Sequence, residues 1–148
     1  MKIISHRGNI NGPDSSVENS PDQIDNCISL GYDVEIDLRI IDNIFYLGHD
    51  TPDYVVGFEW LIKNKDKLWI HCKNLESLRY LSDFDFNFFW HQSDDYTLTS
   101  KGYVWTYPGK DVISKSVIVM PEKISFDFSQ LKEYDVYGVC TDYPTRIL

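Results

Sequence analysis

The sequence has few basic residues and no basic cluster. Its 148 residues contain 14 lysines and arginines against 23 aspartates and glutamates, so the formal net charge is -9 at pH 7. This balance gives little support to binding of nucleic acid or of an anionic membrane surface. An acidic chain of this kind can bind a phosphate group only where the local charge is positive, which requires a bound metal ion or a few suitably placed cationic side chains.

Cysteine is also scarce and has no pattern. Cys27, Cys72 and Cys140 are an odd number without a C-x-x-C pair, which argues against a zinc knuckle or a redox motif. Cys72 and Cys140 lie in apolar strand-like runs, which is typical of buried free thiols in a reducing compartment. The chain shows no signal-peptide pattern and no apolar run of membrane-spanning length. We therefore expect a cytoplasmic protein without a transmembrane segment.

Short strand-like runs dominate what is present, bounded by Gly, Pro, Asp or Asn. They cover residues 2–5, 32–40, 44–47, 68–72, 87–91, 103–106, 117–120 and 137–140. Asp42-Asn43 between two of these runs predicts a tight hairpin turn. Helical patterns are fewer and cover residues 20–30, 58–65 and 74–81, with one further turn at 129–134.

The order of these elements predicts parallel βαβ units, because strand, helix and strand follow one another at the start and over residues 68–91. A complete (β/α)₈ barrel needs roughly 250 residues. We therefore predict an α/β fold, a reduced TIM-like (β/α) barrel with several helices shortened or missing, as a single domain over residues 1–148. Strand edges left open by missing helices would also allow a homo-oligomer.

Two carboxylates stand out in the run Val34-Glu35-Ile36-Asp37. The apolar residues alternate with Glu35 and Asp37, which is the period of a strand, so both carboxylates leave it on the same side. Adjacent carboxylates repel each other unless water or a cation lies between them, and a hard divalent cation is a natural partner. The alternative is a pair of solvent-facing residues on an edge strand.

All four histidines lie at or near the ends of predicted strands: His6, His49, His71 and His91. In a parallel barrel such positions face the mouth, where active sites form. Lys73 shares a face with His71, which indicates an ion pair or an anion site. For His91 the more common use is structural.

Trp105 and Tyr107 also share a strand face. Their rings could stack on a sugar or glycerol-like group, although core positions are the more common use of such residues. Asp142, before Tyr143-Pro144, is most simply a loop or cap residue, near enough to the last strand to approach the barrel mouth.

Five segments form an ordered set along the chain: His6-Arg7-Gly8, Glu18-Asn19-Ser20, Gly31 to Asp37, His49-Asp50 and Tyr137 to Pro144. In order and spacing they resemble the glycerophosphodiester phosphodiesterase family, within the barrel superfamily that includes phosphoinositide-cleaving phospholipases C. The middle of the chain is much shorter than in typical members of that family.

The resemblance implies a division of roles in a phosphodiesterase of lipid metabolism. His6 and His49 would be the acid/base pair that protonates the leaving oxygen and deprotonates the attacking hydroxyl. Glu35 and Asp37 would bind a magnesium or calcium ion that neutralises the phosphate. Arg7 and Lys73 would hold the remaining phosphate oxygens of a small-molecule phosphodiester.

One position departs from that family, which usually has Glu-x-Lys where this chain has His71-Cys72-Lys73. Imidazole suits manganese or zinc better than magnesium or calcium. His71 therefore ligates a softer metal, contacts the phosphate, or marks a site that has lost its cation.

The sequence thus predicts a metal-assisted phosphodiesterase for a glycerophosphodiester-like molecule. Attack by the substrate's own hydroxyl would give a cyclic phosphate, which water would then open. If the cyclic phosphate accumulates, the reaction is lyase-like and not a hydrolysis. The alternative from another class is a non-catalytic phosphate or phospho-sugar binding module on a degenerate barrel.

Overall fold

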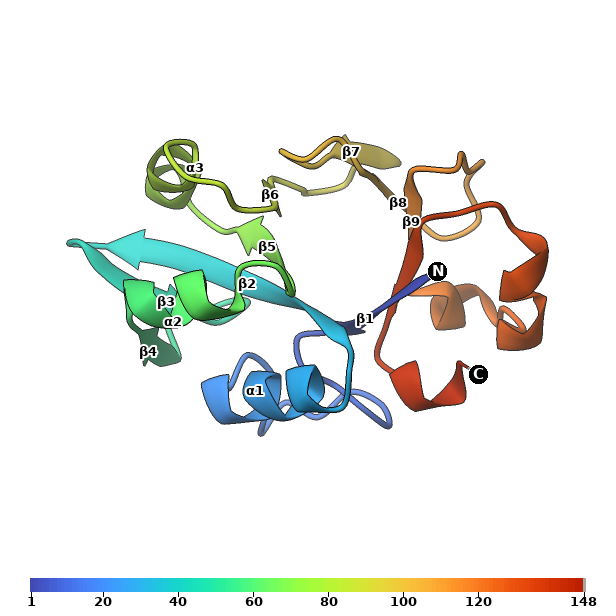
Figure 1. Cartoon of the computed structure of the whole chain (residues 1–148), viewed down its shortest axis with the longest axis horizontal. Coiled ribbons are helices and arrows are strands. Elements are labelled where there is room, and N and C mark those ends of the chain that lie inside the picture. The colour runs from blue at the N-terminus through green and yellow to red at the C-terminus, as the bar shows by residue number, and fades with distance from the viewer. Residues whose placement is uncertain (148) are drawn as a thin grey trace.

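One curled sheet organises residues 1–147, which the computed structural model describes (Figure 1). Along the main path its strands lie in the order β4-β3-β2-β1-β10-β9-β8-β7, while β5 pairs with β2 and β6 pairs with β5. In chain order the strands are β1 (Lys2–His6), β2 (Asp33–Ile41), β3 (Ile44–Leu47), β4 (Tyr54–Val56), β5 (Leu68–Cys72), β6 (Phe88–Phe89), β7 (Tyr96–Leu98), β8 (Val104–Thr106), β9 (Ser116–Val119) and β10 (Gly138–Thr141). The prediction of a mixed α/β fold with few helices is confirmed. The predicted domain also includes Leu148, which lies outside the described residues.

The parallel pairings of this sheet link β6, β5, β2, β1, β10, β9 and β8 in that order. Strand β3 pairs antiparallel with β2 and in turn carries β4, whereas β7 pairs antiparallel with β8. The register places His6 beside Glu35 and Asp37 beside His71. Because paired residues of neighbouring strands point to the same side, four candidate site residues share one face of the sheet.

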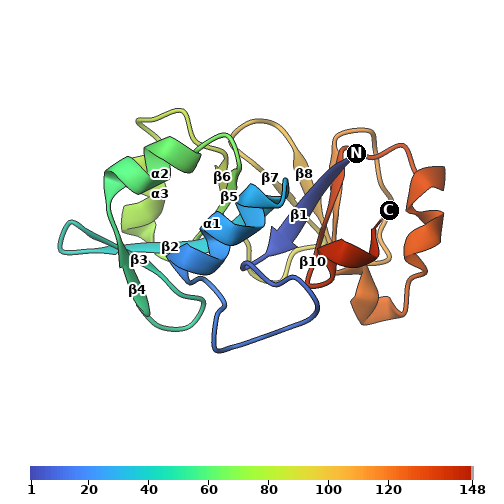
Figure 2. The same ribbon diagram turned by 60° about the horizontal axis from the view of Figure 1, so that its bottom comes forward.

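Three short helices cover one part of the outer face: α1 (Pro21–Ser29), α2 (Phe58–Asn64) and α3 (Leu75–Leu81). Figure 2 shows α1 in front of β2, with β1 beside the helix. Helix α1 begins at Pro21, a position where the missing N–H costs nothing, and α3 begins with a capping box between Asn74 and Ser77. On the other part, 3₁₀ turns replace helices: η1 (Pro121–Ile124), η2 (Phe128–Glu133) and η3 (Pro144–Arg146).

Local predictions hold for most elements and fail for the shortest ones. Asp42 and Asn43 form the predicted hairpin turn, with φ of 50° and 61°. The run predicted over residues 87–91 is a strand only at β6, and the turn predicted at 129–134 is the 3₁₀ turn η2. The sequence did not predict β4 and β7. None of the helices within residues 1–147 is long and apolar enough to cross a membrane.

Hydrophobic clusters fill both sides of the sheet. Outside, Ile36 and Ile70 pack with Ile24 of α1 and Leu81 of α3. Inside the curl lies a second cluster, whose buried members are Ile4, Trp69, Phe89, Trp105, Val117 and Cys140. Within this cluster the ring centroids of Phe89 and Trp105 are 4.7 Å apart and those of Trp69 and Trp105 are 5.8 Å apart. These rings connect the β5–β6 end of the sheet to β8 and hold the curl. All three cysteines are buried free thiols, as the sequence predicted for Cys72 and Cys140.

Candidate active site

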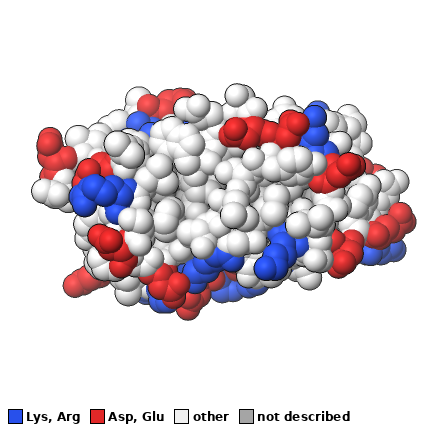
Figure 3. Space-filling view, turned by 90° about the horizontal axis from the view of Figure 1, so that it is seen from above, with Lys and Arg blue, Asp and Glu red and all other residues white. Residues whose placement is uncertain are grey.

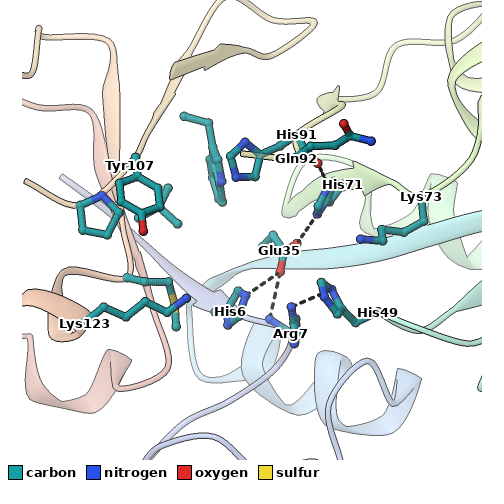
Figure 4. Close-up of a pocket in the computed structure, with 14 residues that line it drawn as sticks. His6, Arg7, Glu35, His49, His71, Lys73, His91, Gln92, Tyr107 and Lys123 are labelled. Carbon is teal, nitrogen blue, oxygen red and sulfur yellow. Dashed lines mark hydrogen bonds and ion pairs between the residues drawn. The ribbon is translucent and has the colours of Figure 1, made fainter. Parts of the chain in front are cut away.

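A cavity of about 410 Å³ opens where the parallel strands end (Figure 4). Its lining includes six of the seven residues that the sequence singled out as catalytic, phosphate-binding or metal-binding: His6, Arg7, Glu35, His49, His71 and Lys73. The seventh, Asp37, is fully buried and lies two residues after Glu35 on β2. The ends of β1, β2, β3 and β5 therefore bring the predicted site together.

Glu35, Asp37 and His71 form a compact group of possible metal ligands. One ligand atom from each lies within 4.8 Å of the others, and all three side chains are buried. Burial and the neighbouring Asp37 raise the pKa of Glu35. Burial opposes the charge on Asp37 as well, yet His49, His71 and Arg7 hold the pKa of Asp37 well below its usual range. The group therefore concentrates negative charge at one buried point.

The hydrogen bonds of His71 decide which of its ring nitrogens faces this group. Nε2 lies 3.0 Å from the carbonyl oxygen of His91, which can only accept, so Nε2 carries a proton. Nδ1 lies 3.2 Å from Asp37 Oδ1 and 3.8 Å from Glu35 Oε1. In the neutral ring this nitrogen directs its lone pair at two carboxylates, which is favourable only with a cation among them. The donor set of two carboxylates and one imidazole therefore fits a divalent metal ion, and its nitrogen favours manganese or zinc.

Asn19 fixes the orientation of Asp37 through two hydrogen bonds. Its side-chain amide donates to Asp37 Oδ2 at 2.9 Å, and its oxygen accepts from the backbone N–H of Asp37 at 2.9 Å. Asn19 is buried with a φ of 60°, a left-handed conformation that asparagine tolerates. The Glu18-Asn19-Ser20 segment therefore supports the site without lining the cavity.

His6 pairs with Asp142, for which the sequence indicated a loop or cap position near enough to approach the barrel mouth. Nδ1 of His6 donates to Asp142 Oδ1 at 2.7 Å, while Nε2 lies 3.9 Å from Glu35 Oε2. Asp142 is buried and held by the side-chain amide of Asn9 at 2.7 Å and, through its own backbone N–H, by Glu122 at 2.9 Å. Burial lowers the pKa of His6, but Asp142 and Glu35 outweigh it and raise the pKa overall. The only indication in the sequence was the place of Asp142 directly after the last strand.

His49 lies just beyond β3 and is partly exposed. Arg7 Nη2 and Asp37 Oδ1 approach its Nδ1 at 2.7 and 3.3 Å. Because a guanidinium only donates, the shorter contact makes Nδ1 an acceptor and places the proton of the neutral ring on Nε2. His49 therefore presents Nε2, which has no hydrogen bond within residues 1–147 and lies 3.7 Å from the exposed carboxylate of Asp50.

All parts of the Arg7 guanidinium contact other protein groups. In addition to His49, Nε lies 3.2 Å from Asp37 and Nη1 lies 3.5 Å from Glu18. No ion pair of Lys73 is found within residues 1–147. Lys73 is therefore the more available cation of the two that the sequence assigned to phosphate.

The far wall of the cavity comes from the β6, β8 and β9 ends, with His91, Trp105 and Tyr107 among its residues. Trp105 is buried against Phe89 in the inner core, whereas Tyr107 is half exposed. Lys123 on η1 also lines this wall, and the sequence did not indicate it. On the face drawn in Figure 3, Lys and Arg are interspersed with acidic groups and form no extended basic patch.

Comparisons with protein-family models, with curated proteins and with solved structures found no match to this chain. What the chain does has to be inferred from its motifs and from the geometry of its own cavity.

Proposed function

We propose that this chain is a metal-assisted phosphodiesterase that acts on a small glycerophosphodiester-like molecule. The observation that carries the proposal is the convergence of His6, His49 and the Glu35–Asp37–His71 group on one cavity. With the exception of His71, these residues come from the motifs that resemble the glycerophosphodiester phosphodiesterase family. An ordered set of motifs that also converges in space is much more specific than any single one of them.

The finer fold we propose is a reduced (β/α) barrel. The neighbours β1-β2-β5-β6 and β8-β9-β10, with β10 returning to β1, support it because this is the circular order of a barrel. Within residues 1–147 no strand pairing joins β6 to β8, so the barrel would be open there. Ring contacts between Phe89 and Trp105 bridge the gap.

Glu35, Asp37 and His71 would hold the divalent cation, with manganese and zinc as candidates beside magnesium and calcium. When bound, such a cation neutralises the phosphate charge and polarises its oxygens. Lys73 would hold a further phosphate oxygen as a point charge. We assign Arg7 chiefly to positioning, because its guanidinium already contacts Asp37, Glu18 and His49.

The two histidines would transfer protons at opposite ends of the reaction. Each has one ring nitrogen fixed by a protein partner, Asp142 for His6 and Arg7 for His49. The other nitrogen, Nε2 in both rings, is left to exchange a proton with substrate. One ring would protonate the leaving oxygen and the other would deprotonate the attacking hydroxyl, which belongs to water or to the substrate itself.

A substrate and metal screen tests this function. Glycerophosphodiesters are offered with magnesium, calcium, manganese and zinc in turn, and product is followed for the cyclic and the opened phosphate. We expect His6→Ala and His49→Ala each to lower kcat by roughly 10²- to 10⁴-fold with an unchanged far-UV circular dichroism spectrum. Full turnover in both variants would end the acid/base assignment.

A phosphate-binding module without catalysis is the second candidate, and one observation favours it. Asp37 already accepts a hydrogen bond from Asn19 and lies 3.2 Å from the Arg7 guanidinium, so part of its charge is compensated without a metal. Titration with manganese or zinc separates the two functions. Binding of phosphate esters without any divalent-ion binding would identify the module.

A further inference from the structure

The charge of the cavity lining is opposite to the charge of the chain. The net charge of the chain is -9, yet the lining contains three cations, Arg7, Lys73 and Lys123, and one carboxylate, Glu35. With neutral histidines, three positive charges and one negative charge give the lining a net charge of +2. The cavity is therefore a local anion site in an acidic protein.

Lys73 and Lys123 approach this cavity from opposite walls (Figure 4). Lys73 follows β5, next to His71, whereas Lys123 is an exposed residue on η1, beyond β9. Neither lysine has an ion pair within the described part of the chain. Because Arg7 is occupied by protein groups, the cavity has two available positive charges on two different sides.

The backbone that carries Lys123 is fixed to the acid/base machinery. Met120 and Ser125 on either side of η1 have φ values of 49° and 56°, which turn the chain sharply at both ends. Glu122, the neighbour of Lys123, accepts a hydrogen bond from the backbone N–H of Asp142 at 2.9 Å. The position of Lys123 relative to the His6–Asp142 pair is therefore set by the fold.

The cavity has room for more than a phosphoryl group. Its volume of about 410 Å³ falls within the range of small-molecule sites, roughly 300–1,000 Å³. A scissile phosphate at the Glu35–Asp37–His71 group lies near Lys73, and the rest of the substrate extends toward the wall that contains Tyr107 and Lys123. In Figure 4 the Tyr107 hydroxyl points toward the same side of the cavity as Lys123.

We infer that Lys123, with the Tyr107 hydroxyl, forms a second anion subsite, and that the preferred substrates are phosphodiesters whose alcohol part bears a second acidic group. That group is a phosphate or a carboxylate, since both accept from an ammonium and a phenol. The inference rests on the proposed phosphodiesterase function, because it names the substrate class for the same cavity.

Binding of small anions tests the subsite without turnover. Isothermal titration calorimetry with the full chain compares propyl phosphate, propane-1,3-diol bisphosphate and 3-phosphonooxypropanoate. Two of these ligands carry a second acidic group, the bisphosphate and 3-phosphonooxypropanoate. We expect at least one of them to bind roughly tenfold more tightly than propyl phosphate. Lys123→Met should remove this preference. Lys132→Met is the matched control, because Lys132 lies on η2 of the same connection, outside the cavity, and should retain the preference.

Two results would overturn the subsite. One is equal affinity of the unaltered protein for all three ligands. The other is an equal loss for propyl phosphate and the bisphosphate in Lys123→Met, which would mean that Lys123 holds the same phosphate as Lys73.

Turnover then separates this inference from the proposed function. The substrates are glycerophosphocholine, glycerophosphoglycerol and glycerophosphoglycerol with a terminal phosphate. We expect the highest kcat/KM for the terminally phosphorylated substrate, and Lys123→Met should lower that value by tenfold or more while changing kcat/KM for glycerophosphoglycerol far less. Equal cleavage of all three substrates contradicts the subsite and supports the phosphodiesterase. Absence of cleavage with every metal contradicts the proposed phosphodiesterase function. The ligand affinities from calorimetry then decide by themselves whether the second anion subsite exists.

Discussion

Single hydrogen bonds determine which ring nitrogen each histidine of the site presents to the cavity. His6 donates Nδ1–H to Asp142, His49 accepts at Nδ1 from Arg7, and His71 donates Nε2–H to a backbone carbonyl. His6 and His49 therefore have Nε2 available for proton transfer, whereas His71 directs Nδ1 at the carboxylates. Three identical side chains therefore present different ring nitrogens to the cavity because their hydrogen-bond partners differ.

Replacing Asp142 by asparagine should lower the pKa of His6. Burial alone lowers this pKa, and the hydrogen bond to the Asp142 carboxylate is the largest influence that raises it. In Asp142→Asn the charge is lost while the shape is kept, so His6 should release its proton at lower pH. The measurement is an NMR titration of the imidazole in protein kept metal-free with a chelator. An unchanged His6 titration curve would contradict the role of Asp142, and His91, which does not contact Asp142, is the internal reference.

Changing His71 to glutamate should alter the metal preference of the site. A carboxylate in place of the imidazole gives Glu35 and Asp37 a third oxygen ligand, as in the family that the chain resembles. We expect His71→Glu to raise magnesium or calcium affinity by roughly tenfold or more and to weaken zinc binding. Calorimetric titration with each metal measures both changes. Identical affinities in the two proteins would remove His71 from the ligand set.

Sequence reasoning found the site residues that follow strand patterns and missed those that depend on long-range contacts. His6, Glu35, Asp37 and His71 share a face because of strand period and register, which the sequence encodes locally. Asp142 meets His6 across 136 positions, and no local pattern indicates that pairing. Lys123 lies on a 3₁₀ turn whose direction depends on packing around Met120 and Glu122. Arg7 was expected to hold phosphate, and only the structure shows that its guanidinium contacts His49, Asp37 and Glu18.

At the scale of elements, the segments with strong local patterns formed where the sequence placed them. Strand β2 alternates and is bounded by a hairpin turn, and α3 has its capping box. Strands β4 and β7 were missed because each has three residues and lies at an end of the sheet, with Val55 and Leu98 66% and 68% exposed. Such strands form because the neighbouring strand provides backbone hydrogen-bond partners. Their own sequence pattern of apolar and polar residues is too short to predict them.

The loop after β3 depends on Gly48 for its conformation. Its φ is 153°, and an added Cβ would lie 1.8 Å from the carbonyl oxygen of Thr51. Gly48→Ala should therefore destabilise the protein by about 2–4 kcal/mol and displace His49. Urea denaturation measures the loss. The matched control is Gly57→Ala, where nothing lies within 4 Å of the added Cβ, and it should change stability by less than about 1 kcal/mol. Similar losses in both variants would contradict the steric argument.

At the scale of the whole molecule, the sheet is covered unequally. Three helices pack on the outer cluster around β2 and β5, whereas 3₁₀ turns connect the strands on the β9–β10 side. The chain length had indicated that several helices would be missing, and the structure shows which part of the sheet lacks them. The aromatic inner core supports the curl and places the acidic group at the end of the cavity. Burying Glu35 beside Asp37 opposes folding unless positive charge compensates them.

A divalent ion that binds this group should therefore stabilise the whole fold. Binding to the native state alone adds about 2.7 kcal/mol at a metal concentration 100 times the Kd. We expect manganese or zinc to raise Tm in a concentration-dependent manner, and Asp37→Asn to abolish the rise. Asp83→Asn, which alters an exposed carboxylate next to α3, should retain it. Differential scanning calorimetry of the three proteins, each with chelator and with metal, measures the effect. An equal rise in Asp37→Asn would show that the ion binds elsewhere. A Tm of the unaltered protein that does not change with metal would support the phosphate-binding module instead of the metal-assisted enzyme.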